Sequence, residues 1–212
     1  MTTVGLLHGL GGTAATMGPL AELLRRRGIE VACPTLPGHG GSDDALGAAT
    51  WADWLAAVPH TPVLVGQSMG ATLALAAAAT RDDVLAVIAI NPVLADPDAA
   101  EGLEWQASRG LEWIDAPLAD GEPGHARLPV RSVLQMVHGT LAVPLADVRV
   151  PVVLATGALD DTADPWALDA LAAQLGGPVQ RLVLPGSGHV ATFGPDLELL
   201  MEPIERLTTR SG

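Results

Sequence analysis

Short apolar segments alternate with Ala- and Leu-rich segments along most of the chain, and this alternation restricts the fold more than any other feature. Each apolar segment is a nearly continuous hydrophobic run, as expected of parallel strands covered on both faces. The apolar runs are 3–7, 28–33, 62–65, 84–90, 150–155 and 179–184. The helical patterns are 13–27, 48–58, 69–80, 165–175 and 196–208. The order predicts an α/β fold with an open, mostly parallel sheet of about six strands flanked by helices.

One long connection, between the fourth and fifth predicted strands, is longer than a single crossover helix requires. It contains the tetrapeptide Gly-Leu-Glu-Trp twice, ending at Trp105 and Trp113. In one continuous helix this spacing would put the two indoles on adjacent faces. Because long insertions in compact domains are usually functional, we predict a small lid of residues 94–147, called the insertion below. Residues 1–93 and 148–212 would form the core.

The composition is that of a single compact domain, with 49% hydrophobic and 17% charged residues. A net charge of −13 argues against a nucleic-acid partner, and the one dense basic run, 25–27, lies where a helix is expected to end. Cys33 is the only cysteine, which excludes an intrachain disulfide, and we interpret it as a small buried residue. No apolar run is long enough to span a bilayer, and the N-terminus lacks a signal-peptide pattern. We therefore expect a cytoplasmic location without membrane insertion.

The segment Gly-Gln-Ser-Met-Gly, residues 66–70, directly follows a predicted strand and precedes a predicted helix. The pattern is weak alone, but this context is typical of a nucleophile at a sharp strand-to-helix turn. A side chain at Gly66 or Gly70 would collide with neighbouring chain in such a turn. The helix N-terminus would favour an anion developing at Ser68. The segment predicts that Ser68 is a nucleophile.

A serine nucleophile needs a base and an acid that orients the base, in the chain order serine, acid, histidine for this kind of turn. His189 follows the last predicted strand in a glycine-rich turn and is the predicted base. The acid is expected just after the fifth predicted strand, where Asp160 is the first choice. Asp161 is the competing choice and Asp96 a remote alternative. Asp164 precedes a proline and is interpreted as a helix N-cap.

A glycine-rich segment, residues 8–12 with the sequence His-Gly-Leu-Gly-Gly, follows the first predicted strand and is called the glycine turn below. Acyl transfer needs backbone N–H donors aimed at the oxyanion, and this turn together with the residue after the nucleophile nominates Leu10 and Met69. The turn lacks the glycine and lysine signatures of a phosphate-binding loop. His8 and His39 are interpreted as structural donors. Because no histidine pair has metal-ligand spacing, we expect neither a metal nor a cofactor.

Several of these segments together resemble the α/β-hydrolase superfamily. They are the glycine turn, Pro-Gly-His-Gly-Gly-Ser-Asp at 37–43, the pentapeptide 66–70, Asp160, and Ser-Gly-His at 187–189. Within the superfamily, the chain is similar to small bacterial carboxylesterases related to monoacylglycerol lipases.

The resemblance has three further implications. In those esterases an Asp followed by an acidic residue in this loop is the triad acid, which favours Asp160 over Asp161. They also carry a small helical cap at the position of the insertion, and the role of segment 37–43 is taken as structural. The chain departs from the usual pattern at Gln67, where His or Leu is commoner, and at Ala71, which replaces a frequent Gly.

The activity that the resemblance implies is hydrolysis of carboxylic esters through an acyl-enzyme. The substrate would be a small-molecule neutral ester with a short or medium acyl chain or an aryl group. Trp105, Trp113 and Met136 of the insertion are predicted to line its pocket. The acidic surface disfavours polyanionic substrates such as CoA esters.

Other activities remain open from the sequence. A thioesterase, a lactonase or a C–C bond hydrolase would use the same triad. From a different class, the scaffold would suit a cofactor-free lyase or perhydrolase, or a ligand-binding protein without turnover. A monomer and a homodimer are both compatible with the sequence.

Overall fold

The computed structural model describes residues 3–93, 96–118, 121–161 and 165–210. Within these residues the main sheet has six strands in the order β2-β1-β3-β4-β7-β8, all pairs parallel. The strands are β1 (Thr3–Leu7), β2 (Glu30–Ala32), β3 (Val63–Gln67), β4 (Ala86–Ile90), β7 (Val152–Gly157) and β8 (Val179–Leu184). Each coincides with, or overlaps, a predicted apolar run, so the predicted open parallel sheet is confirmed.

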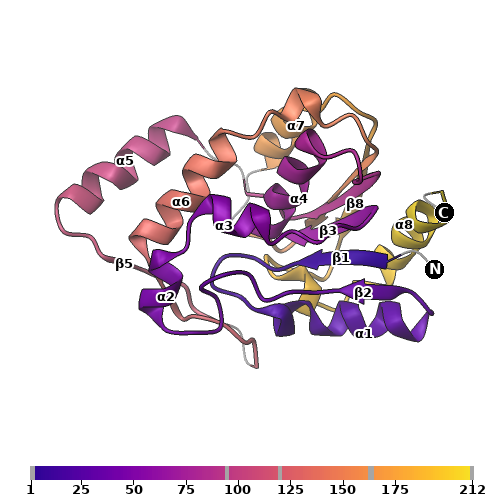
Figure 1. Cartoon of the computed structure of the whole chain (residues 1–212), viewed down its shortest axis with the longest axis horizontal. Coiled ribbons are helices and arrows are strands. Elements are labelled where there is room, and N and C mark those ends of the chain that lie inside the picture. The colour runs from indigo at the N-terminus through magenta and orange to yellow at the C-terminus, as the bar shows by residue number, and fades with distance from the viewer. Residues whose placement is uncertain (1–2, 94–95, 119–120, 162–164, 211–212) are drawn as a thin grey trace.

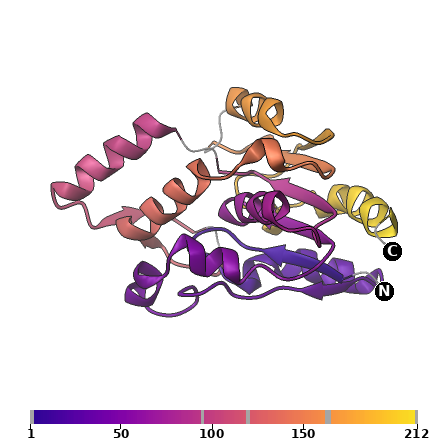
Figure 2. The same cartoon turned by 45° about the horizontal axis from the view of Figure 1, so that its top comes forward.

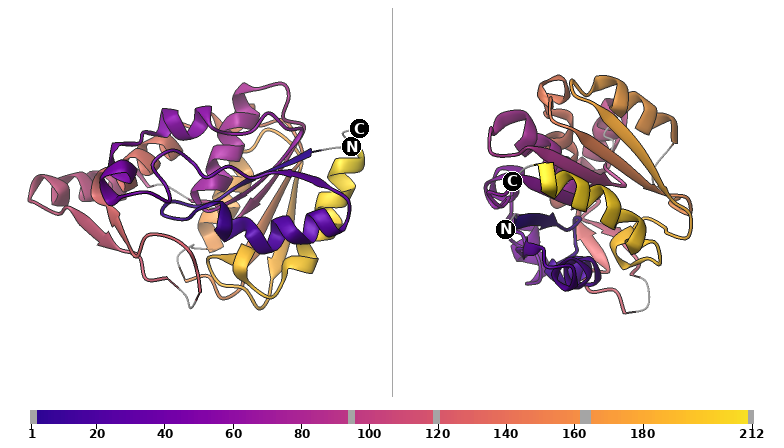
Figure 3. Two further views of the ribbon diagram at one scale, coloured as in Figure 1. Left: turned by 60° about the horizontal axis from the view of Figure 1, so that its bottom comes forward. Right: turned by 90° about the vertical axis from the view of Figure 1, so that its right-hand side faces the viewer.

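Helices cover both faces of this sheet (Figure 3). On one face lie α1 (Gly18–Arg26) and α8 (Leu197–Arg210), and on the other α3 (Trp51–Ala56), α4 (Met69–Thr80) and α7 (Pro165–Gln174). Successive strand residues point to opposite faces, so each strand supplies two separate apolar cores. In β3, for example, Val63 and Val65 face α1 and α8, whereas Leu64 faces α4. Both faces of the inner strands β1, β3, β4 and β7 are buried, which explains their continuous hydrophobic runs, whereas the edge strands β2 and β8 are partly exposed.

The predicted helical stretch 48–58 contains α3 but is not one continuous helix. The structure has two short helices instead, α2 (Asp43–Ala48) and α3, with Thr50 between them. The Thr50 hydroxyl accepts from the Asp53 N–H, and the Asp53 carboxylate accepts from the Thr50 N–H. This capping box begins a new helix and ends the apparent continuity of the pattern.

The insertion contains α5 (Pro97–Ser108), a two-stranded antiparallel hairpin of β5 (Trp113–Asp115) and β6 (Arg127–Pro129), and α6 (Val130–Leu141), as far as its residues are described. A helical cap was expected, and the hairpin was not. Gly110, with φ of 100°, follows the end of α5, so Trp105 lies in a helix and Trp113 in a strand. The two indoles therefore do not belong to one continuous helix. The boundaries 94 and 147 stay a prediction.

The insertion lies at the carboxyl ends of the strands, and the two termini lie at the opposite end of the molecule (Figures 1 and 2). Short 3-10 turns complete the described elements: η1 (Ala14–Met17), η2 (Leu145–Asp147) and η3 (Ala191–Phe193). Parallel register aligns Leu7 with Gly66 and Gln67 with Ile90, so the loops after β1, β3 and β4 emerge side by side. Within the part of the chain that the structure describes, no helix is both long and apolar enough to cross a membrane.

Candidate active site

Ser68 stands between β3 and α4 with φ of 56° and ψ of −121°, an unfavourable conformation for a residue with a side chain. The neighbouring backbone explains the two glycines of its segment. A Cβ at Gly66 would lie 2.1 Å from the Gly70 carbonyl oxygen, and one at Gly70 would lie 2.2 Å from the Leu7 carbonyl oxygen. The turn is therefore possible only without side chains at these positions, and it presents the Ser68 hydroxyl at the edge of the sheet.

His189 joins Ser68 to Asp160. Its Nε2 lies 3.1 Å from Ser68 Oγ, and its Nδ1 lies 3.0 Å from Asp160 Oδ2 and 3.2 Å from Oδ1. Because a carboxylate only accepts hydrogen bonds, Nδ1 carries the ring proton and Nε2 is the acceptor for the serine hydroxyl. The Asp160 side chain is 1% exposed, so this ion-pairing partner is shielded from water.

The alternative acids lie elsewhere. Asp161 lines the cavity described below, whereas Asp160 contacts the imidazole. Asp96 caps α5, where its Oδ1 accepts from the Asp98 N–H at 3.0 Å. Asp164 lies outside the described residues.

Two buried amides hold the loop that carries His189, and the sequence reasoning had not assigned them this role. Asn91 Nδ2 donates to the carbonyl oxygens of Gly188 (3.0 Å) and His189 (2.7 Å), and its Oδ1 accepts from the Gly157 N–H (2.9 Å). Gln67 Nε2 donates to the same His189 carbonyl at 2.6 Å. In the sequence, the feature that could have indicated this role for both residues is a polar side chain at the carboxyl end of an apolar strand.

The glycine turn is held by His8. The Leu36 N–H donates to His8 Nε2 at 3.0 Å, so Nδ1 carries the ring proton and donates to the Gly9 carbonyl at 2.9 Å. Gly12 N–H donates to the same carbonyl at 3.1 Å. Since a peptide group is planar, anchoring the Gly9 oxygen also sets the direction of the Leu10 N–H.

The two buried histidines are neutral. Burial lowers the pKa of His8 to about 4, and burial together with the neighbouring His8 lowers that of His39 to about 4. Their rings meet edge to face, and His39 packs in the same way on Trp54. His39 Nδ1–H donates to the Pro37 carbonyl at 3.1 Å. Both rings therefore act inside the fold, beside the site.

A cavity of about 690 Å³ opens beside Ser68 and His189. Leu10, at its wall, and the buried Met69, at the first turn of α4, are the predicted oxyanion donors. First-turn N–H groups have no acceptor within their own helix. Met136 lines the cavity as predicted, with Val93 and several apolar residues of the insertion.

Trp105 and Trp113 do not line this cavity, so this part of the pocket prediction is corrected. The Trp105 side chain lies on α5 and is 61% exposed. The β5 residues that line the cavity are Ile114 and Asp115. The Trp113 ring instead lies under the Arg127 guanidinium, 4.1 Å from the ring centre.

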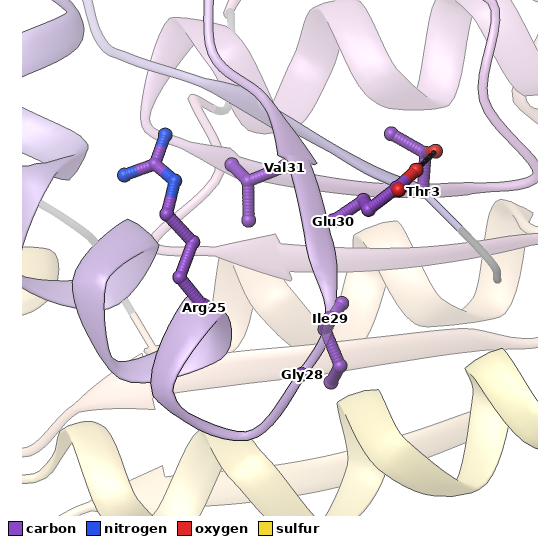
Figure 4. Close-up of a pocket in the computed structure, with 6 residues that line it drawn as sticks. All are labelled: Thr3, Arg25, Gly28, Ile29, Glu30 and Val31. Carbon is purple, nitrogen blue, oxygen red and sulfur yellow. Dashed lines mark hydrogen bonds between the residues drawn. The ribbon is translucent and has the colours of Figure 1, made fainter.

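A second hollow, of about 480 Å³, lies at the other end of the sheet (Figure 4). It is formed where β1 and β2 begin, and the Thr3 hydroxyl there donates to Glu30 Oε2 at 3.1 Å. Its lining residues are Thr3, Arg25, Gly28, Ile29, Glu30 and Val31. This set contains no histidine to activate its hydroxyl, so the hollow is unsuited to nucleophilic catalysis.

Among the residues described by the structure, no group of three or more His, Cys, Asp or Glu could hold a metal ion. Burial raises the pKa of the Cys33 thiol to about 11, which keeps it protonated at neutral pH.

A model of the alpha/beta hydrolase family matches residues 6–199. The chain belongs to this family. This α/β hydrolase is 28% identical over 215 residues to the thermostable monoacylglycerol lipase of Bacillus sp. strain H-257. The aligned region covers 93% of this chain and 86% of the relative.

Solved structures show the same fold. A structure of the metagenome-derived lipolytic enzymes LipS and LipT superposes with a TM-score of 0.84 at 24% identity, covering 98% of this α/β hydrolase and 93% of that chain. The monoacylglycerol lipase of Paleococcus ferrophilus gives a TM-score of 0.72 at 21% identity, with coverage of 98% and 94%.

Proposed function

We propose that this α/β hydrolase is a serine hydrolase of carboxylic esters that acts through an acyl-enzyme on Ser68. The observation that carries the proposal is the hydrogen-bonded series Ser68–His189–Asp160 at the mouth of an apolar cavity. Nucleophile, base and orienting acid are the three groups that acyl transfer to a serine requires. The lipolytic activity named for the Bacillus relative supports the same reaction class.

In the proposed reaction Ser68 Oγ attacks the acyl carbonyl while His189 Nε2 takes the hydroxyl proton. Asp160 holds Nδ1–H and stabilises the imidazolium that forms. The N–H groups of Leu10 and Met69 donate to the tetrahedral oxyanion, and one such donor typically contributes about 3 kcal/mol. The alcohol leaves with the proton from His189, and water repeats the sequence to release the acid.

The cavity supports a neutral ester with a short or medium acyl chain. Its apolar wall, which includes Val93 and Met136, offers acyl carbons a dry surface. Asp115, Glu122 and Asp161 also line it, and the chain carries a net charge of −13. Both features disfavour anionic substrates. A monoacylglycerol, the substrate class in the name of the Bacillus relative, is such a neutral ester.

The proposal is tested with p-nitrophenyl esters of increasing chain length and with matched thioesters. Wild-type protein is expected to prefer short or medium oxygen esters. Ser68→Ala is expected to lower kcat by about 10⁴-fold or more. Ser108→Ala is the control, because Ser108 lies on α5 and its hydroxyl donates only to the neighbouring Trp105 carbonyl at 2.7 Å. Unchanged turnover in Ser68→Ala would overturn the proposal, and a preference for thioesters would replace it with a thioesterase.

A further inference from the structure

The insertion touches the core at the glycine turn, beside the proposed oxyanion donor. The contact comes from residues 121–126, between β5 and β6, called the docking loop here. His125 N–H donates to the Gly11 carbonyl at 2.8 Å, and the Thr16 hydroxyl donates to the Pro123 carbonyl at 3.3 Å. A Cβ at Gly124 would lie 2.7 Å from the Gly11 oxygen. The two backbones are thus as close as a glycine allows.

Asp43, at the start of α2, holds this loop from the core side. Its Oδ1 accepts from His125 Nδ1–H at 3.0 Å, and its Oδ2 accepts from Arg127 Nη2 at 2.9 Å and Nε at 3.2 Å. The His125 side chain is only 9% exposed. Hydrogen bonds from His125 and Arg127 hold the pKa of the Asp43 carboxyl below its usual value. Arg127 is fixed further by its position over Trp113.

These contacts complete the restraint of the glycine turn. The carbonyl of Gly9 is anchored by His8 and Gly12 from within the core. The carbonyl of Gly11 is anchored by the backbone of His125 from the docking loop. The Gly11 carbonyl shares a planar peptide group with the Gly12 N–H, and that N–H donates to the Gly9 carbonyl. The Gly9 carbonyl in turn shares its peptide group with the Leu10 N–H, so the docking loop reaches the Leu10 N–H through the hydrogen bond between Gly12 and Gly9.

We propose that Asp43 is a positioning residue for the oxyanion donor: by holding His125 and Arg127, it keeps the docking loop on the glycine turn and the Leu10 N–H aimed at Ser68. The inference rests on the proposed function, because it uses the role proposed there for Leu10. The inference also assigns a role to Asp43 as the last residue of segment 37–43, whose role was interpreted from the sequence as structural. Oriented donors act on the transition state more than on bound substrate, so Asp43 should affect kcat rather than KM.

The test compares Asp43→Ala with Asp44→Ala. Both changes remove one carboxylate from the first turn of α2, but the Asp44 side chain is 96% exposed and its ion pair with Arg131 is long, at 3.5 Å. Kinetics on a p-nitrophenyl ester are combined with inhibition by an alkyl boronic acid. The boronate adds to the Ser68 hydroxyl and places a tetrahedral oxygen where the oxyanion would form.

Asp43→Ala is expected to lower kcat about 10-fold, to change KM less than about twofold, and to raise the boronate Ki by the same factor as kcat/KM falls. Asp44→Ala should match wild type in all three. A folded Asp43→Ala protein with an unchanged Ki, or with its loss confined to KM, would overturn the inference.

Circular-dichroism melting checks that the variants fold. If Asp43→Ala does not fold, Arg127→Gln takes its place. The Arg127 side chain is 56% exposed, and this change removes only one of the two side chains that Asp43 binds. It is expected to lower kcat/KM and boronate affinity together by about threefold, and no joint loss would contradict the inference. An active Ser68→Ala protein would instead overturn the proposed function, so the two failures are distinguishable.

Discussion

At the scale of single residues, Asn91 is the side chain whose polar contacts hold most of the site together. It is fully buried and sits in the left-handed region, with φ of 43°, which Asn tolerates better than most residues. Its side chain bonds to the backbone of Gly157, at the end of the strand before Asp160, and to the carbonyls of Gly188 and His189. Asn91 therefore couples the acid loop to the base loop.

Asn91→Ala is expected to lower the free energy of unfolding by about 3 kcal/mol, because it leaves a buried N–H and a buried carbonyl without partners. The looser loop should also lower kcat on esters about 10-fold. Urea unfolding and ester kinetics measure the two effects. Gln174→Ala, which removes an exposed amide bonded within α7, is the control. Stability and kcat both at wild-type level would show that Asn91 does not hold the loops.

Residues of the candidate site were predictable where position along a strand decides their place. Ser68, Asp160 and His189 each follow a strand, and parallel strands bring those ends together. Trp105 and Trp113 were not predictable in the same way. Their directions depend on where α5 ends and on which face of a three-residue strand meets the cavity, and neither is encoded in hydrophobic spacing.

At the scale of elements, the β3–α4 turn depends on glycine because three chain segments meet there. Gly70→Ala is expected to lower the free energy of unfolding by about 3 kcal/mol or more, since its Cβ would lie 2.2 Å from the backbone oxygen of Leu7, which cannot rotate away. Gly102→Ala in α5 is the matched control. Nothing lies within 4 Å of its Cβ, so it should stabilise the helix by about 0.5–1 kcal/mol. Equal effects of the two changes in urea unfolding would contradict this account.

Elements with long hydrophobic runs were predicted well, and short ones were not. The buried strands of the main sheet can be recognised in the sequence because both of their faces are apolar, which gives a continuous hydrophobic run. The hairpin of β5 and β6 has three residues in each strand and includes Asp115 and Arg127, so it gives no periodic signal. The break between α2 and α3 depends on one capping box at Thr50.

At the scale of the whole molecule, the buried histidines predict sensitivity to acid. The pKa of His8 is lowered to about 4 by burial, so the folded chain does not bind a proton there between pH 6.5 and 4, whereas the unfolded chain does. Stability is thus present above pH 6.5 and falls as pH falls. Between pH 7.5 and 5.0 this group alone should remove about 2 kcal/mol.

Urea unfolding at pH 7.5 and 5.0 checks this, with His8→Gln as the comparison because glutamine does not titrate. The variant should lose less stability than wild type over the same interval. Carboxyls whose pKa is lowered in the folded chain, such as that of Asp43, stabilise the fold above their unfolded pKa of about 4. Their contribution is lost only below about pH 4, so it does not change between pH 7.5 and 5.0. A variant with the wild-type pH dependence would contradict the role given to His8.

Labelling with an organophosphonate ester, followed by intact mass and peptide mapping, tests directly whether Ser68 is the nucleophile. We expect one adduct per chain, on the peptide that contains Ser68, with loss of ester hydrolysis in proportion to labelling. Ser68→Ala should neither be labelled nor hydrolyse esters. An adduct on another residue, or ester turnover that survives complete labelling of Ser68, would contradict the role of Ser68 as the nucleophile.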